Sequence, residues 1–216
     1  MIDWSRIDTV FLDMDGTLLD LRFDNHFWRE HMPRRYAEHH GLDETAARLH
    51  LDRHYQRHAG TLNWYCLDFW SSELALDIVQ LKEEVAHLIA VRPDVPAFLQ
   101  ALRDSGRRVV MVTNAHPGSL GLKMRETGID AYFDALISSH RLGLPKEHPD
   151  FWGKLQALEA YDAARTLFVD DSLPVLESAR AYGIAHLLAI CNPDSSLPHK
   201  DCGDFTAISS FAEVMP

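Results

Sequence analysis

The chain has little cysteine, and the few cysteines it has are scattered. Cys66, Cys191 and Cys202 are its three cysteines, and no two of them form a CxxC pair. An odd number of widely separated cysteines argues against a disulfide framework and against a zinc cluster. We therefore expect reduced thiols and a cytoplasmic protein.

Positive charge is also scarce. Lysine and arginine number 21 against 32 aspartates and glutamates, which gives a formal net charge of −11. This balance argues against a nucleic acid polymer or an anionic membrane as a partner. It also opposes an anionic small molecule, whose site would need a bound cation, local lysines or aimed backbone N–H groups.

Long apolar runs are missing. No stretch approaches the roughly 18 apolar residues that a membrane helix needs, and the start MIDWSRIDTV lacks the pattern of a signal peptide. We therefore expect no membrane partner. The composition leaves the oligomeric state open.

What the sequence does contain is an alternation of strand-like and helix-like segments. Short apolar runs occupy 7–13, 107–113, 134–139, 165–171 and 184–190. Helical spacing occupies 94–105, 117–128, 148–160 and 173–182. This alternation predicts an α/β fold whose core is a doubly wound, Rossmann-like parallel sheet.

Residues 23–91 interrupt the alternation. They contain no convincing strand and show helical spacing throughout. We expect an all-helical insert of about four helices placed after the first strand, with residues 1–22 and 92–216 forming the core. The segment 205–214 is expected to add a short strand or helix.

Polar residues gather where the predicted strands end. They are Asp13 and Asp15, Thr113 and Asn114, Lys146, and Asp170 and Asp171. The carboxyl ends of parallel strands meet at one edge of an open α/β sheet, where ligands bind. Buried carboxylates are costly unless they are paired or bind metal, and oxygen ligands of this kind suit Mg²⁺. The sequence therefore predicts a magnesium site where four carboxylates meet.

These strand ends carry a family resemblance. The string DMDGTLLD at 13–20, Thr113 in VTNA, Lys146 in GLPKE and the acidic pair in FVDDS resemble, in order and spacing, the motifs of the haloacid-dehalogenase superfamily. The resemblance implies a Mg²⁺-dependent phosphatase whose helical insert is a cap over the site. Passages outside the motifs, among them TLNWYCLDFW and ICNPDS, are similar to the bacterial 5′-nucleotidases that prefer GMP and IMP.

The resemblance gives two aspartates catalytic roles. Asp13 is the predicted nucleophile, since a carboxylate is ionised at neutral pH and needs no base to attack phosphorus and form an aspartyl-phosphate. Asp15 is the predicted general acid–base, which protonates the leaving oxygen and then activates water. Dehalogenases of the superfamily lack this second aspartate, so Asp15 argues against dehalogenation.

The other motif residues are assigned to phosphate and metal. The predicted phosphate-binding residues are Thr113, Asn114 and Lys146. The predicted metal ligands are Asp13, Asp15, Asp170 and Asp171, with Asp15 acting through its main-chain carbonyl. Whether Asp170 binds directly or through water is left open.

Candidate substrate contacts lie in and beside the insert. They are Arg22, Asp24, Asn25, Trp28, Asn63, Trp64, Tyr65 and His116. Most aromatic residues at helical spacing are core, so at least half of this set is expected to be structural. The remaining histidines lie mostly in the insert, where they indicate a solvated face and not a metal site.

Two alternatives share this pattern. A phosphomutase, or a phosphatase acting on sugar phosphates or other small metabolites, would have every one of these motifs. A non-catalytic binding protein on the same scaffold would usually have lost a motif, whereas this sequence keeps all of them.

Overall fold

The structure is a computed structural model that describes residues 2–216. Six parallel strands form one sheet in the order β3-β2-β1-β4-β5-β6. Their bounds are β1 Thr9–Leu12, β2 Arg108–Thr113, β3 Ala135–Ser138, β4 Thr166–Asp170, β5 His186–Ile190 and β6 Ala207–Ile208. Strand order reverses at β1, so the carboxyl ends of β1, β2 and β4 surround one crevice.

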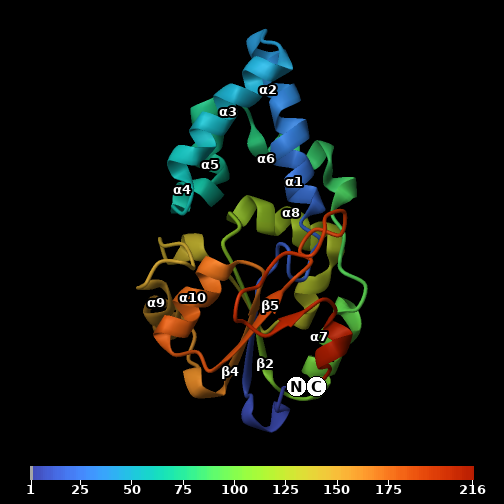
Figure 1. The fold of residues 1–216 in the computed structure, drawn as a ribbon, viewed down its shortest axis with the longest axis vertical. Coiled ribbons are helices and arrows are strands. Elements are labelled where there is room, and N and C mark those ends of the chain that lie inside the picture. Colours follow the sequence, from blue (N-terminus) through green and yellow to red (C-terminus); the bar gives the residue numbers. More distant parts are fainter. Residues whose placement is uncertain (1) are drawn as a thin grey trace.

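Helices cover both faces of this sheet. They are α7 Val95–Asp104, α8 Pro117–Thr127, α9 Phe151–Leu158 and α10 Leu173–Tyr182. Side chains alternate along β1, because Val10 and Leu12 pack with α7 while Phe11 packs with α9 and α10. Figure 1 shows α9 and α10 on one side of the sheet and α7 on the other. The doubly wound prediction is confirmed, and each of the five predicted strands is present and slightly shorter than expected.

The segment between β1 and β2 forms a helical lobe. Its helices are α1 Arg22–His26, a π-helical turn Phe27–His31, α2 Met32–His40, α3 Glu44–His58, α4 Leu62–Tyr65, α5 Leu67–Leu74 and α6 Ile78–Glu84. These are more segments than the four expected, because the caps Asp43, Cys66 and Asp77 each start a new helix. The lobe stands apart from the sheet in Figure 1 and has its own apolar cluster, to which α8 contributes Leu122.

Short 3₁₀ turns complete the chain. They are Trp4–Arg6, Ala86–Leu88, Ile129–Tyr132, Ser139–Arg141, Ala163–Arg165 and Phe211–Val214. The segment 205–214 thus supplies both a strand and a helical turn. The Trp4 indole donates to the carbonyl of Met215 at 3.0 Å, and the two chain ends lie together in Figure 1. Within residues 2–216, no helix combines the length and the apolar character needed to cross a membrane.

A substitution at Leu99 tests how tightly α7 packs on the sheet. Leu99 is fully buried there, so Leu99→Ala should lower the free energy of unfolding by about 2–5 kcal/mol in urea denaturation. Leu197 is 51% exposed, so the same change there should stay within about 0.5 kcal/mol of wild type. Equal losses at the two positions would contradict this account of the core.

Candidate active site

A buried lysine joins the ends of two neighbouring strands. Lys146 Nζ donates to Asp13 Oδ1 and to Asp170 Oδ2, each at 2.6 Å, and to the carbonyl of Val112 at 3.1 Å. The N–H of Asp13 donates to the carbonyl of Val169 at 3.0 Å, which extends the pairing of β1 with β4. The register of the sheet therefore brings Asp13 beside Asp170.

Three aspartates form an acidic cluster at this edge. Asp13, Asp170 and Asp171 offer carboxylate oxygens that lie within 4.8 Å of one another. Burial raises the pKa of Asp13 to about 6 despite the attraction of Lys146, and burial also raises the pKa of Asp170 and of Asp171 to about 6. This donor set, made only of oxygens and carrying excess negative charge, fits a hard divalent cation.

Asp15 lies outside that cluster. Its Oδ1 accepts from Lys123 Nζ at 2.6 Å, while Met14, between the two aspartates, is fully buried in the core. Burial raises the pKa of Asp15 to about 6, and the attraction of Lys123 opposes the rise. The expectation that four carboxylates meet is therefore corrected to three, because Lys123 holds the carboxylate of Asp15 away from the other three. The predicted metal contact of Asp15 can involve only its main-chain carbonyl.

Lys123 also connects the core to the helical lobe. Its Nζ donates to Asp24 Oδ2 at 2.6 Å, and Lys82 Nζ donates to Asp24 Oδ1 at 2.7 Å. Burial opposes ionisation of Asp24, but the two lysines outweigh it and lower the pKa of Asp24 to about 2. Asp24, predicted as a substrate contact, thus lines the cavity with both carboxylate oxygens already bonded. Sequence reasoning missed both lysines, although each stands among apolar residues, in LGLKM and IVQLK.

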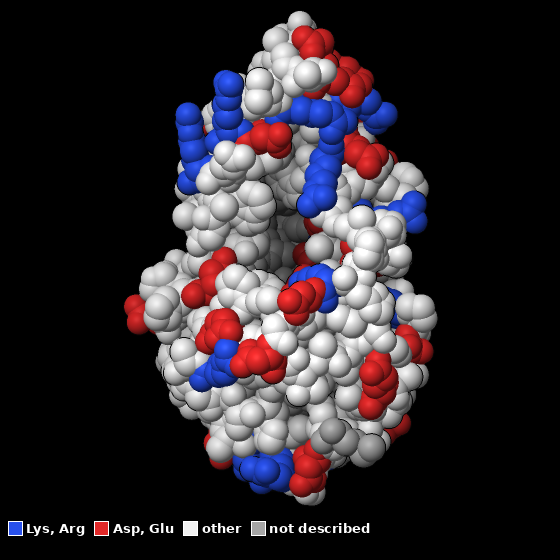
Figure 2. Space-filling model, viewed as in Figure 1, with Lys and Arg blue, Asp and Glu red and all other residues white. Residues whose placement is uncertain are grey.

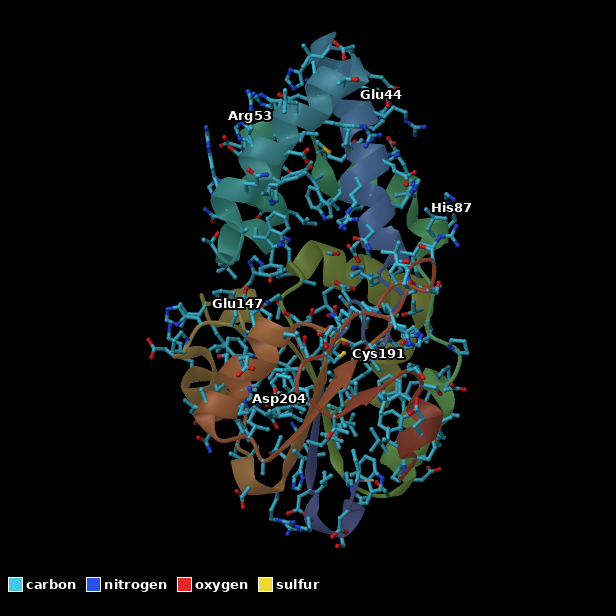
Figure 3. The ribbon with its side chains drawn as sticks, in the orientation of Figure 1. Glu44, Arg53, His87, Glu147, Cys191 and Asp204 are labelled. Atoms are coloured by element: carbon cyan, nitrogen blue, oxygen red, sulfur yellow. The ribbon has the colours of Figure 1, made fainter. Side chains whose placement is uncertain are left out.

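The second motif is tied to the lobe through Glu147. Asn114 Oδ1 accepts the N–H of Lys146 at 2.9 Å, and its Nδ2 donates to Glu147 Oε2 at 2.9 Å. The hydroxyl of Tyr65, in α4, donates to Glu147 Oε1 at 3.0 Å. Thr113 is buried beside them. Figure 3 shows Glu147 at the edge of the core that faces the lobe.

A cavity of about 840 Å³ separates the lobe from the core, and Figure 2 shows the molecule hollowed between them. Asp13, Asp15 and Lys146 lie on its core side. Of the eight predicted substrate contacts, six line it: Asp24, Asn25, Trp28, Trp64, Tyr65 and His116. Arg22 and Asn63 are exposed and do not line it, so they are not brought to the site.

Aromatic rings form the lobe side of the cavity. Trp28 packs edge to face on Tyr55 with ring centres 5.6 Å apart, and Tyr55 packs on Trp64 in the same way at 5.9 Å. Trp64 remains 37% exposed. We call Trp28, Tyr55, Trp64 and Trp70 the aromatic wall.

Two further features are informative at the cavity. Sequence reasoning missed Arg48, Asp52 and Gln56, whose spacing of four residues on α3 aims them at the cavity along one helix face. Asn25 Nδ2 donates to Asp194 Oδ2 at 2.7 Å, which occupies part of its amide.

The backbone at Gly16 shows why the first motif needs a glycine. Its φ is +82°, which favours glycine, and a Cβ there would lie 2.8 Å from Asp171 Cγ. The chain therefore turns after Asp15 in close contact with the acidic cluster, and any side chain at this position would displace Asp171.

Comparison with known proteins agrees with this geometry. A family model described as haloacid dehalogenase-like hydrolase matches residues 7–183. The GMP/IMP nucleotidase YrfG of Escherichia coli (strain K12) is 40% identical over 215 residues, which cover 100% of this chain and 97% of that protein. A HAD phosphatase from Thermococcus onnurineus superposes with a TM-score of 0.79 at 22% identity, over 96% of each chain. The L-2-haloacid dehalogenase of Xanthobacter autotrophicus does so at 0.64 and 17% identity, over 97% of this chain and 100% of that one.

A parallel α/β sheet with an acidic cluster and a buried lysine at its carboxyl edge is an α/β fold whose ligand edge suits a divalent cation and a phosphate. The chain belongs to the haloacid dehalogenase-like hydrolases, because the family model covers most of it and a relative matches its full length. It is a phosphatase of that family, and the predicted resemblance to the nucleotidases is confirmed. The two solved structures show the shared fold alone.

The raised pKa values predict how pH and Mg²⁺ act together on stability. A carboxylate whose folded pKa is raised contributes stability below its unfolded pKa, and this contribution is lost as pH rises from about 4 to about 6. Mg²⁺ favours the ionised form, so it should raise the melting temperature more at about pH 7.5 than at about pH 5. Thermal unfolding with and without Mg²⁺ measures this. Equal shifts at both pH values would contradict the assignment of the cation to this cluster.

Proposed function

We propose that the chain is a Mg²⁺-dependent phosphomonoesterase that forms an aspartyl-phosphate on Asp13 and hydrolyses purine nucleoside 5′-monophosphates, GMP and IMP first. The observation that carries the proposal is one cavity with Asp13, Asp15 and Lys146 on one side and an aromatic wall on the other. The identity with a GMP/IMP nucleotidase over the full chain supports it.

Asp13 and Asp15 divide the chemistry. A carboxylate oxygen of Asp13 attacks phosphorus in line and displaces the ribose 5′ oxygen, which takes a proton from Asp15. Asp15 then takes a proton from water as that water attacks the phosphorus, which frees phosphate and restores Asp13. A pKa of about 6 suits Asp15 to both steps near neutral pH.

The charges around Asp13 prepare it for an anionic substrate. Asp13, Asp170 and Asp171 would hold Mg²⁺, which when bound supplies positive charge to offset the phosphate and the carboxylates. Lys146 holds Asp13 in place at 2.6 Å and adds a second positive charge. Thr113 and Asn114, at the end of β2, are the proposed contacts for phosphate oxygens.

The opposite side of the cavity suits a purine base. Stacking of a base on an aromatic side chain is worth about 1–3 kcal/mol, and Trp64 is the exposed ring of the wall. The 6-oxo group and N1–H that GMP and IMP share, and AMP lacks, would be matched by a donor from Arg48 and an acceptor from Asp52. These residues replace the exposed Asn63 as the proposed base contacts.

The helical lobe is the proposed cap, with the division at residues 23–91 that the sequence predicts. A cap of this kind excludes water from the cavity and selects the substrate. Lys123 and Glu147 are the contacts through which the lobe meets the catalytic residues. A cytoplasmic location also stays a prediction.

Asp13→Asn tests the nucleophile. The amide neither attacks phosphorus nor balances a cation, so turnover of p-nitrophenyl phosphate should fall by at least about 10³-fold while the protein stays folded. Asp104→Asn makes the same change on the exposed side of α7 and should retain wild-type turnover. Retention of about a tenth of wild-type activity in Asp13→Asn would remove Asp13 from this role.

A panel of phosphate monoesters tests the substrate. GMP and IMP should be hydrolysed with kcat/KM about ten- to a hundredfold above sugar phosphates, because only the nucleotides stack. Trp64→Ala should lower this advantage and leave p-nitrophenyl phosphate turnover intact, whereas Leu49→Ala, an exposed change on α3, should alter neither. A flat profile would defeat the purine proposal, and phosphate transferred to a sugar instead of water would indicate a mutase.

A further inference from the structure

A second group of side chains with metal-ligating atoms lies beside the cavity. Cys66, His116 and His140 each offer one ligand atom, and these three atoms lie within 4.8 Å of one another. Cys66 joins α4 to α5, His116 caps α8, and His140 lies in the 3₁₀ turn after β3. The group therefore spans the helical lobe and the core. Cys66 and His140 do not line the catalytic cavity.

The donors of this group are available for a ligand. The Nε2 atom of His140 is buried and has no hydrogen-bond partner, an arrangement that costs free energy unless something binds there. His140 is uncharged near neutral pH, because burial, helped by His116, lowers its pKa to about 4. Cys66 is a free thiol whose Sγ accepts the N–H of Phe69 at 3.4 Å.

The carboxylate of Asp68 lies next to the group. Asp68 Oδ2 lies 3.4 Å from Nε2 of His116, and Asp68 is exposed and free to turn. Because Nδ1 of His116 accepts the N–H of Gly118 at 3.2 Å, Nε2 is its outward nitrogen. Coordination through Nε2 moves the ring proton to Nδ1 at the expense of that contact, and the Cys66 thiol gives its proton to solvent.

We propose that Cys66, His116 and His140, with Asp68, bind a zinc-like divalent cation that clamps the helical lobe to the core. One sulfur, two ring nitrogens and one carboxylate oxygen suit tetrahedral Zn²⁺ and do not suit Mg²⁺. Neighbouring ligand atoms in such a site lie about 3.3–3.8 Å apart. The ligand atoms of Cys66, His116 and His140 already lie within 4.8 Å of one another, so small side-chain rotations would bring them to these distances. The sequence argued against a zinc cluster because the site follows no motif: Cys66 and Asp68 lie far from His116 and His140 in the chain.

The position of the site gives it a consequence for turnover, and this part rests on the proposed function. Cys66 directly follows Trp64 and Tyr65, which line the cavity. An ion bound there would fix this part of the lobe on the core and slow the opening through which product leaves. The expected effect is inhibition by Zn²⁺ of the Mg²⁺-supported reaction.

Cobalt is the probe of binding, because Co²⁺ replaces Zn²⁺ and a thiolate ligand gives it a charge-transfer absorption band. The wild type should show this band with one equivalent of Co²⁺, and Cys66→Ala and His140→Gln should lose it. Cys191→Ala is the matched control and should keep it, although Cys191 has His199 3.7 Å from its sulfur. Circular dichroism and p-nitrophenyl phosphate turnover with Mg²⁺ establish that each variant is folded. A band absent from wild type, kept in Cys66→Ala or lost in Cys191→Ala would overturn the site.

Inhibition tests the clamp. Loss of one ligand costs at least about tenfold in metal affinity, so Zn²⁺ at fixed Mg²⁺ should inhibit wild type at concentrations about tenfold lower than Cys66→Ala. Equal inhibition of both would assign the effect of zinc to the acidic cluster and overturn the clamp. Absence of phosphatase activity in wild type would defeat the proposed function, and the cobalt result would still decide the binding site.

Discussion

The ammonium group of Lys146 is the contact on which the rest of the site depends. It binds Asp13 and Asp170 at 2.6 Å each, and all three side chains are buried. Two carboxylates at adjacent strand ends repel each other in a low dielectric, so the pairing of β1 with β4 needs this cation between them. Lys200 Nζ lies 3.2 Å from Asp171 Oδ2, and two lysines still leave the three carboxylates of the acidic cluster with excess negative charge. That excess is the physical reason for proposing a divalent cation, which when bound would let an acidic protein receive a phosphate.

A buried lysine also compensates the second aspartate, Asp15, and the same lysine joins the core to the helical lobe. Lys123 binds Asp15 in the core and Asp24 in the lobe, so the charge that opposes the effect of burial on the pKa of Asp15 also holds the lobe. Glu147 makes a parallel connection from Tyr65 to Asn114. Movement of the lobe would therefore alter the surroundings of Asp15 and of the second motif together.

Much of the core could be predicted from the sequence, because short runs of apolar residues determine where its strands form. Apolar runs mark the buried strands, and their polar ends mark the edge where Asp13, Asp170 and Asp171 meet. The partners of Asp15 could not be predicted, since Lys123 reaches it from α8 across 108 residues of sequence. In the lobe, a helix of four residues is too short for its sequence to show which side faces the cavity. Asn63 and Trp64 were therefore both predicted as substrate contacts, and of these two residues only Trp64 lines the cavity.

Trapping of the phosphoenzyme is the measurement that tests the central claim most directly. GMP labelled with ³²P at phosphorus, mixed with enzyme and Mg²⁺ and quenched in acid within the first turnover, should leave label on the protein. The label should be released by hydroxylamine, as an acyl phosphate is, and should map to the peptide that contains Asp13. The label should be absent from Asp13→Asn, which has no carboxylate to attack phosphorus. Turnover of GMP with no protein-bound label, or with label on another residue, would contradict the account.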